Sequence, residues 1–195
     1  MRFRFCDDLG PDGFGWVVEE AGARTSHALA ADGKVWLVDA LDWAEAIDRA
    51  LGLGEPAGVI QLLDRHNRDC AAVASRLGVP LHRVPERVDA PLELARVVNL
   101  PVWRERALWW ADRRVLVTAD ALGTTGYFTI GDERIGVHPL LRLFPPRRLA
   151  RFDPDVVLVG HGEGIRDASA AFREALSGSR RRVLPLPSRL RRTGG

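Results

Sequence analysis

Residues 61–72, QLLDRHNRDCAA, hold the densest group of side chains that could bind a metal ion or activate water. They follow an apolar stretch, residues 58–63, whose composition predicts a buried strand, and they precede an amphipathic segment that begins near Cys70. Asp69 and Cys70 offer a carboxylate and a thiol, and both groups are zinc ligands in proteins. Because α/β proteins often place their chemistry where a strand gives way to a helix, this segment is a candidate site.

Three further polar residues follow apolar stretches that predict strands. Asp39 comes after VWLV, Asp120 after VLVTA, and His161 after VVLVG. The ends of strands converge at the edge of a sheet, so we expect these residues to approach the first group in space. The glycines on both sides of His161 favour close backbone packing around a specified side chain.

The elements that would position these residues are short strands mixed with few helices. The expected strands cover residues 15–19, 25–31, 34–39, 58–63, 81–84, 94–99, 106–110, 114–117 and 155–160. Helices are expected between Asp42 and Gly52, with Asp42 and Glu45 as a capping box, then from Asp69 to Gly78, and over residues 165–176. This order predicts an α+β protein with mixed sheets and helices on the outer faces.

Composition predicts one domain and a basic tail. The 195 residues are 46% hydrophobic, enough for one sizeable core, which we place in residues 1–176. Residues 177–195 hold six arginines and no acid, so the rest of the chain is net negative although the whole carries +2. Cys6 and Cys70 are far apart in sequence and no apolar stretch is long enough for a membrane span, which favours a reduced, cytoplasmic setting without a disulfide framework.

The order and flanks of these elements resemble the metallo-β-lactamase-like hydrolase family, from about residue 15 to residue 176. The resemblance lies in residues 35–39, VWLVD, in residues 119–122, ADAL, and in residues 159–163, VGHGE, which a helix follows. It implies a four-layer αββα sandwich, with two mixed sheets between outer helices. It also implies metal-dependent hydrolysis with zinc as the metal.

The family's histidine motif (His-x-His-x-Asp-His) falls on residues 65–70, where this chain has several other side chains. The resemblance implies that one of two metal positions is erased, because its histidines are replaced by Arg65, Asn67 and Trp103. The second position would keep four donors, Asp69, Cys70, Asp120 and His161. Asp120 and Arg65 are the expected catalytic residues, with Arg65 orienting an anionic group of the substrate.

Several alternatives remain open. A shifted register would use Asp64 and His66 as the first ligand pair, with Arg68 and Asp69 after them. Asp69 also suits a helix N-cap, Cys70 a buried apolar position, and Asp120 a strand end. Arg65 placed between Asp69 and Asp120 would instead form a salt-bridged remnant without metal. His27, His82 and His138 have no partner spacing and are expected to be structural.

Two functions therefore follow from the sequence. The first is a hydrolase with a single zinc ion acting on a small-molecule substrate that the sequence does not specify. The second is a metal-free, non-catalytic member of the fold that acts as a binding module. Nucleic-acid binding is not expected, because the basic tail has no aromatic residues among its arginines, and self-association is left open.

Overall fold

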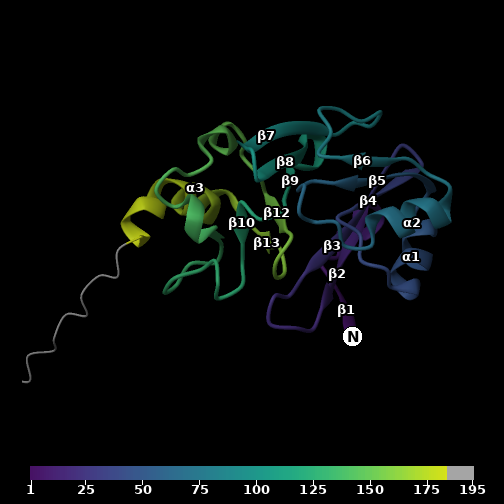
Figure 1. The fold of residues 1–195 in the computed structure, drawn as a ribbon, viewed down its shortest axis with the longest axis horizontal. Helices are drawn as coiled ribbons and strands as arrows, with labels where there is room; N and C mark the ends of the chain where they lie inside the picture. The colour runs from purple at the N-terminus through teal and green to yellow at the C-terminus, as the bar shows by residue number, and fades with distance from the viewer. Residues whose placement is uncertain (184–195) are drawn as a thin grey trace, which may run out of the picture.

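The first of the two larger β-sheets in the computed structural model, which describes residues 1–183, has six strands (Figure 1). The strands lie in the order β1-β2-β3-β4-β5-β6. Neighbours are antiparallel from β1 to β4, and β5 pairs in parallel with both β4 and β6. The bounds are β1 Phe3–Cys6, β2 Gly13–Val18, β3 Thr25–Ala31, β4 Lys34–Val38, β5 Glu55–Gln61 and β6 Leu81–Arg83.

The second sheet has five strands in the order β13-β12-β9-β8-β7. Only β12 and β9 are parallel. The bounds are β7 Glu93–Leu100, β8 Trp103–Trp110, β9 Val115–Thr118, β12 Val156–Val159 and β13 Ile165–Arg166. A small separate pair is formed by β10 Leu122–Gly123 and β11 Gly136–Val137.

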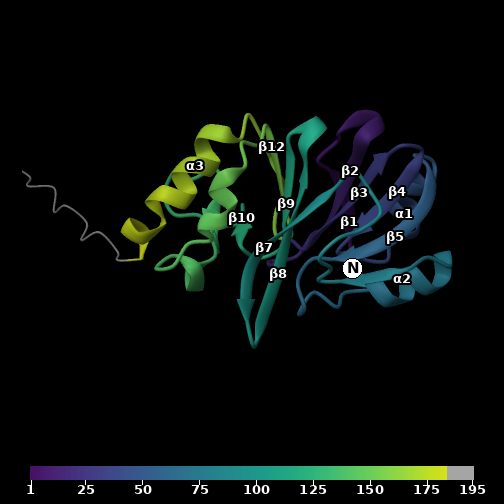
Figure 2. The same cartoon turned by 90° about the horizontal axis from the view of Figure 1, so that it is seen from above.

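Three α-helices within residues 1–183 cover the outer faces, which confirms the α+β sandwich of four layers (Figure 2). Helices α1 Ala44–Leu51 and α2 Cys70–Leu77 lie outside the first sheet, and α3 Ser169–Gly178 lies outside the second. Short 3-10 turns connect the remaining segments: η1 Gly10–Asp12, η2 Ala111–Arg113, η3 Pro139–Leu141, η4 Arg147–Arg151 and η5 Ser179–Arg182. None of the described helices is long and apolar enough to cross a membrane.

Strand β4 shows why the layers form. Successive side chains of a strand point to opposite faces, so Trp36 and Val38 enter the core between the sheets while Val35 and Leu37 face the helices. All four are at most 3% exposed, which explains why β4 is apolar from Val35 to Val38 instead of alternating with polar residues. The sheet is thereby fixed between two apolar layers.

Two expected helix starts differ from the structure. The capping box of α1 does not form, because Asp42 binds the guanidinium of Arg76 on α2 at 2.5 and 2.7 Å, and Trp43 occupies the N-cap without a side-chain bond. Helix α3 begins at Ser169, four residues later than expected, because Ile165 pairs with Val157 in a short antiparallel strand. The first difference comes from a contact with a residue distant in sequence, and the second from a hairpin with the preceding strand.

The C-terminal boundary expected at residue 176 is followed by further regular structure. Helix α3 continues to Gly178, and Ser179–Arg182 forms a 3-10 turn in which Ser179 is buried. Arg182 is anchored by Glu133 and Glu174, at 2.8 Å each. The rest of the predicted tail, residues 184–195, lies outside the described residues.

Candidate metal centre

Three potential ligands meet where the two sheets come together. His66 Nε2 lies 2.8 Å and His161 Nε2 lies 3.2 Å from the same atom, Asp120 Oδ1. All three ligand atoms lie within 4.8 Å of one another. The residues come from the loops that follow β5, β9 and β12, so the convergence expected at the strand ends does occur for Asp120 and His161.

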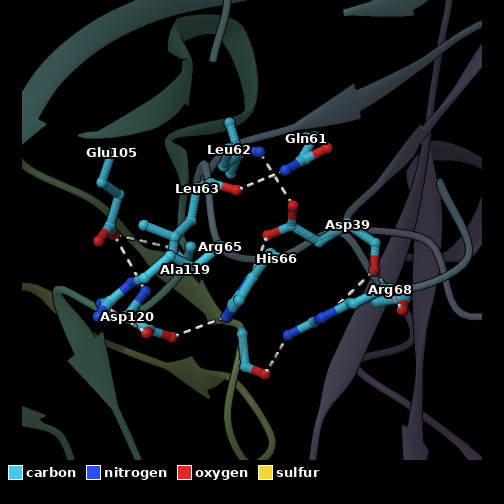
Figure 3. A network of polar contacts seen from close by, with 12 residues as sticks. Asp39, Gln61, Leu62, Leu63, Arg65, His66, Arg68, Glu105, Ala119 and Asp120 are labelled. Atoms are coloured by element: carbon cyan, nitrogen blue, oxygen red, sulfur yellow. Dashed lines mark hydrogen bonds and ion pairs between the residues drawn. The ribbon is translucent and has the colours of Figure 1, made fainter. Parts of the chain in front are cut away.

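The other ring nitrogen of each histidine is held by an oxygen atom. His66 Nδ1 lies 3.0 Å from Asp39 Oδ2, and His161 Nδ1 lies 2.6 Å from the carbonyl oxygen of Gly22. A carbonyl can only accept, so His161 carries a proton on Nδ1, and an ionised Asp39 imposes the same tautomer on His66. Figure 3 shows His66 between Asp39 and Asp120.

In that tautomer the three potential ligand atoms, which lie close together, all carry lone pairs and no proton. Both Nε2 atoms and the buried Asp120 Oδ1 are then acceptors, and Asp120 Oδ1 has no donor hydrogen. Only a cation, either a proton or a metal ion, satisfies such a group. Ligands around a tetrahedral zinc ion with bonds of about 2.0 Å lie roughly 3.3 Å apart, and the distances to Asp120 are close to that spacing.

The charges around Asp120 set the protonation of the cluster. When protons occupy the cluster, burial acts to raise the pKa of Asp120, but hydrogen bonds donated by the Nε2–H groups of His161 and His66 outweigh it and hold this pKa well below its usual range. Burial and the nearby Arg68 act to lower the pKa of His66, while Asp39 and Asp120 act against them and raise it overall. The cluster therefore keeps Asp120 ionised, as a ligand or an ion-pair partner must be.

Asp39 links the cluster to the end of β4. Its backbone adopts a left-handed conformation with φ 47° directly after this strand. Oδ1 then accepts from the Leu62 amide at 2.9 Å while Oδ2 holds His66. The residue is 3% exposed, so it is positioned to orient His66 and not to meet a substrate.

Arg68 provides a fixed positive charge beside this group (Figure 3). Nη1 donates to the carbonyls of Thr25 and Asp39, and Nη2 donates to the carbonyl of Gly160 at 2.9 Å. The side chain thus joins the ends of β3, β4 and β12 across both sheets. No spacing in the sequence singles Arg68 out from the other arginines.

Glu105 supports Asp120 from behind. Its Oε1 accepts the amides of Ala119, Asp120 and Ala121 at 3.1, 3.1 and 2.9 Å, and its Oε2 accepts Trp103 Nε1 at 3.0 Å. The residue is fully buried, and burial raises its pKa to about 7 although the amide of Ala121 acts in the opposite direction. Glu105 therefore fixes the turn that presents Asp120 to the two histidines.

Arg65 lies at the open side of the cluster. Its guanidinium is 3.7 Å from Asp120 Oδ2 and stacks over the ring of Trp103 at 4.6 Å. The side chain is 49% exposed, so it remains accessible to a ligand. It does not bridge Asp69 and Asp120, because Asp69 lies elsewhere.

Asp69 and Cys70 are not brought to the cluster. Asp69 Oδ2 accepts the Asp42 amide at 2.9 Å, and Asp69 makes no side-chain cap on α2. Cys70 is the fully buried first residue of α2, with Sγ 3.7 Å from the Ala40 carbonyl, in the apolar layer against the first sheet. Of the four expected ligands, only Asp120 and His161 lie in the cluster, and His66 is the third member in place of Asp69 and Cys70.

His66 takes the place of the expected ligands because the extended segment after β5 is longer than the sequence pattern predicts. Residues beyond β5 continue beside β8 through a bridge between Leu63 and Glu105, and Asp64 Oδ2 binds the Arg104 amide. His66 is then the residue that turns inward, as the shifted register allowed. Asp64 does not join it as a ligand.

We expect both cysteines to be inert in the folded protein. Burial raises the pKa of Cys70 to about 12, and burial also raises the pKa of Cys6. At about pH 8, a thiol reagent should label neither residue rapidly, because the thiolate is the reactive form. A Ser177→Cys variant with an exposed thiol serves as the positive control, and urea should release both native thiols. Fast labelling of native Cys70 would contradict its buried position.

No protein-family model matches the sequence, and no curated protein matches it. Solved structures do match. The DIM-1 metallo-β-lactamase exposed to ceftazidime superposes with a TM-score of 0.61, at 11% identity over 92% of this chain and 98% of that chain. The chain has the metallo-β-lactamase fold.

Two further structures with this fold give the same result. The TMB-1 structure matches with a TM-score of 0.55, at 12% identity over 91% of this chain and 95% of that one. Residues 1–254 of a putative diflavin flavoprotein A 5 from Nostoc sp. PCC 7120 match with a TM-score of 0.58, at 12% identity over 93% and 96%. The metallo-β-lactamase fold therefore spans nearly the whole chain.

Proposed function

We propose that this protein is a metal-dependent hydrolase that holds one ion with His66, Asp120 and His161. The observation that carries the proposal is the pair of histidines whose Nδ1 atoms are fixed by Asp39 and by the Gly22 carbonyl. Such second contacts orient metal-ligating histidines and raise their basicity. Two histidines and one carboxylate are a common set for catalytic zinc, which keeps its remaining position open.

The chain's own residues would share the work of hydrolysis. A zinc ion, when bound, would acidify a water molecule and polarise the group under attack. Asp120 Oδ2 lies outside the histidine contacts and, as an ionised carboxylate, would accept a hydrogen bond that orients the attacking water. Arg65, exposed beside it, would orient an anionic group of the substrate by a charge-assisted hydrogen bond.

Metal content tests the proposal directly. Protein purified without chelator should contain about one equivalent of zinc or another divalent metal, measured by elemental analysis. Asp120→Asn and His161→Gln should lose it. Asp69→Asn and Cys70→Ala are the matched controls and should keep it, because neither residue lies in the cluster.

The Arg65–Asp120 contact favours a second candidate, a metal-free binding module. In that case protonated histidines and Arg65 would balance the charge of Asp120, without any ion. The wild type would then contain no metal, and adding zinc would leave its melting temperature unchanged. Metal lost from the cluster variants and retained in the controls would exclude this second candidate.

A further inference from the structure

A cavity of about 390 Å³ opens between β6 and β7, the edge strands of the two sheets. Four arginines line it: Arg83 on β6, Arg96 on β7, and Arg104 and Arg106 on β8. It is separate from the metal centre, because on β8 these arginines alternate with Trp103 and Glu105, which face Arg65 and the Asp120 turn.

The arginines of the cavity lie close together although their like charges repel each other. Arg96 and Arg106 are direct cross-strand partners in the β7–β8 ladder, and like charges in that position are unfavourable. One carboxylate oxygen, Glu86 Oε1, serves both guanidinium groups, at 3.5 and 3.1 Å. Glu86 is 78% exposed, so it screens them only weakly.

The cavity keeps unused donors. Arg83 has no carboxylate partner among residues 1–183, and the only acid besides Glu86 in the lining, Asp64, is engaged by Arg104 at 3.3 Å. Arg106 is only 12% exposed, and its Nε is buried without a hydrogen-bond partner. A buried guanidinium that lacks a hydrogen-bond partner is costly, and an anion in the cavity would balance its charge and bind its accessible side.

The lining also indicates the kind of anion. Guanidinium groups match the oxygens of phosphate in a bidentate manner. The apolar lining residues are Val84 and Val98, and no aromatic ring is present to stack on a base, so the ligand is compact. The volume is within the usual range for a small-molecule site.

We propose that this cavity binds a compact phosphate-bearing molecule, with Arg83, Arg96 and Arg106 as its main contacts. Asp64 and Asn67 belong both to the cavity wall and to the loop that carries His66. A bound anion would therefore contact the same loop as the metal centre, from its opposite side.

Calorimetric titration with inorganic pyrophosphate tests the proposal. The wild type should show saturable binding that weakens with salt, and Arg83→Gln and Arg106→Gln should each weaken it by about tenfold. Arg173→Gln is the control, because Arg173 is an exposed arginine paired with Asp153 far from the cavity. Arg83 is exposed, so its variant should keep the wild-type melting temperature even if Arg106→Gln does not.

Two more measurements keep the result specific. Asp120→Asn should bind pyrophosphate as the wild type does, which separates the cavity from the metal centre and from the fate of the hydrolase proposal. Malonate at equal ionic strength should bind more weakly than pyrophosphate. No saturable binding, equal binding of malonate, or affinity unchanged in both arginine variants would each overturn the proposal.

Discussion

Glu105→Ala should lower the free energy of unfolding by about 3–5 kcal/mol, because four buried donors lose the carboxylate that accepts from all of them. Three of them are the amides of residues 119–121, and the fourth is the indole of Trp103. The turn that carries Asp120 loses its support, so the variant should also lose any metal ion that the proposed site binds. Urea unfolding followed by tryptophan fluorescence measures the change.

Two comparisons make this result specific. Glu105→Gln should fall between the wild type and Glu105→Ala, because its amide oxygen can still accept from the backbone while its NH₂ meets the indole N–H of Trp103. Glu93→Ala removes an exposed carboxylate that pairs with Arg151, and it should change stability by less than about 1 kcal/mol. A Glu105→Ala protein as stable as Glu93→Ala would show that the buried carboxylate is not needed.

Arg68→Met should lower the free energy of unfolding by about 2–3 kcal/mol. The loss comes from the missing hydrogen bonds to three carbonyls and from the missing positive charge near Asp39. Arg68→Lys should recover only part of this, since one ammonium cannot replace a planar fork that spans three strand ends. Thermal and urea unfolding would report both changes.

Arg65→Met is the matched control on the same loop. Its guanidinium is 49% exposed, and its contact with Asp120 is long at 3.7 Å, so little stability should be lost. Equal unfolding curves for Arg65→Met and Arg68→Met would contradict the bridging role given to Arg68.

The strands built from apolar runs could be predicted well from the sequence. Strands such as β4 and β12 follow from local composition, because a buried strand needs continuous apolar residues whatever lies beyond it. The capping box at Asp42 failed for the opposite reason: its carboxylate has a stronger partner in Arg76, thirty-four residues away. A local sequence pattern cannot show that Arg76 competes with the helix N-terminus for the Asp42 carboxylate.

The site was predictable only at the strand ends. Asp120 and His161 follow apolar strands directly, and their approach follows from the sandwich. His66 depended on a register that is set by the Leu63–Glu105 bridge between the two sheets. Glu105 itself lies between Arg104 and Arg106, and such a run of charged residues is typical of a solvent-exposed segment. The local sequence therefore does not indicate that Glu105 is buried.

Arg68 has a consequence for how this protein depends on its surroundings. A metal ion must be acquired from the cell, competes with other ions for its ligands, and can be stripped by chelators. The guanidinium of Arg68 is made with the chain and cannot exchange. Part of the positive charge at the junction of the sheets is therefore present from the moment of folding, in metal-poor and metal-rich conditions alike.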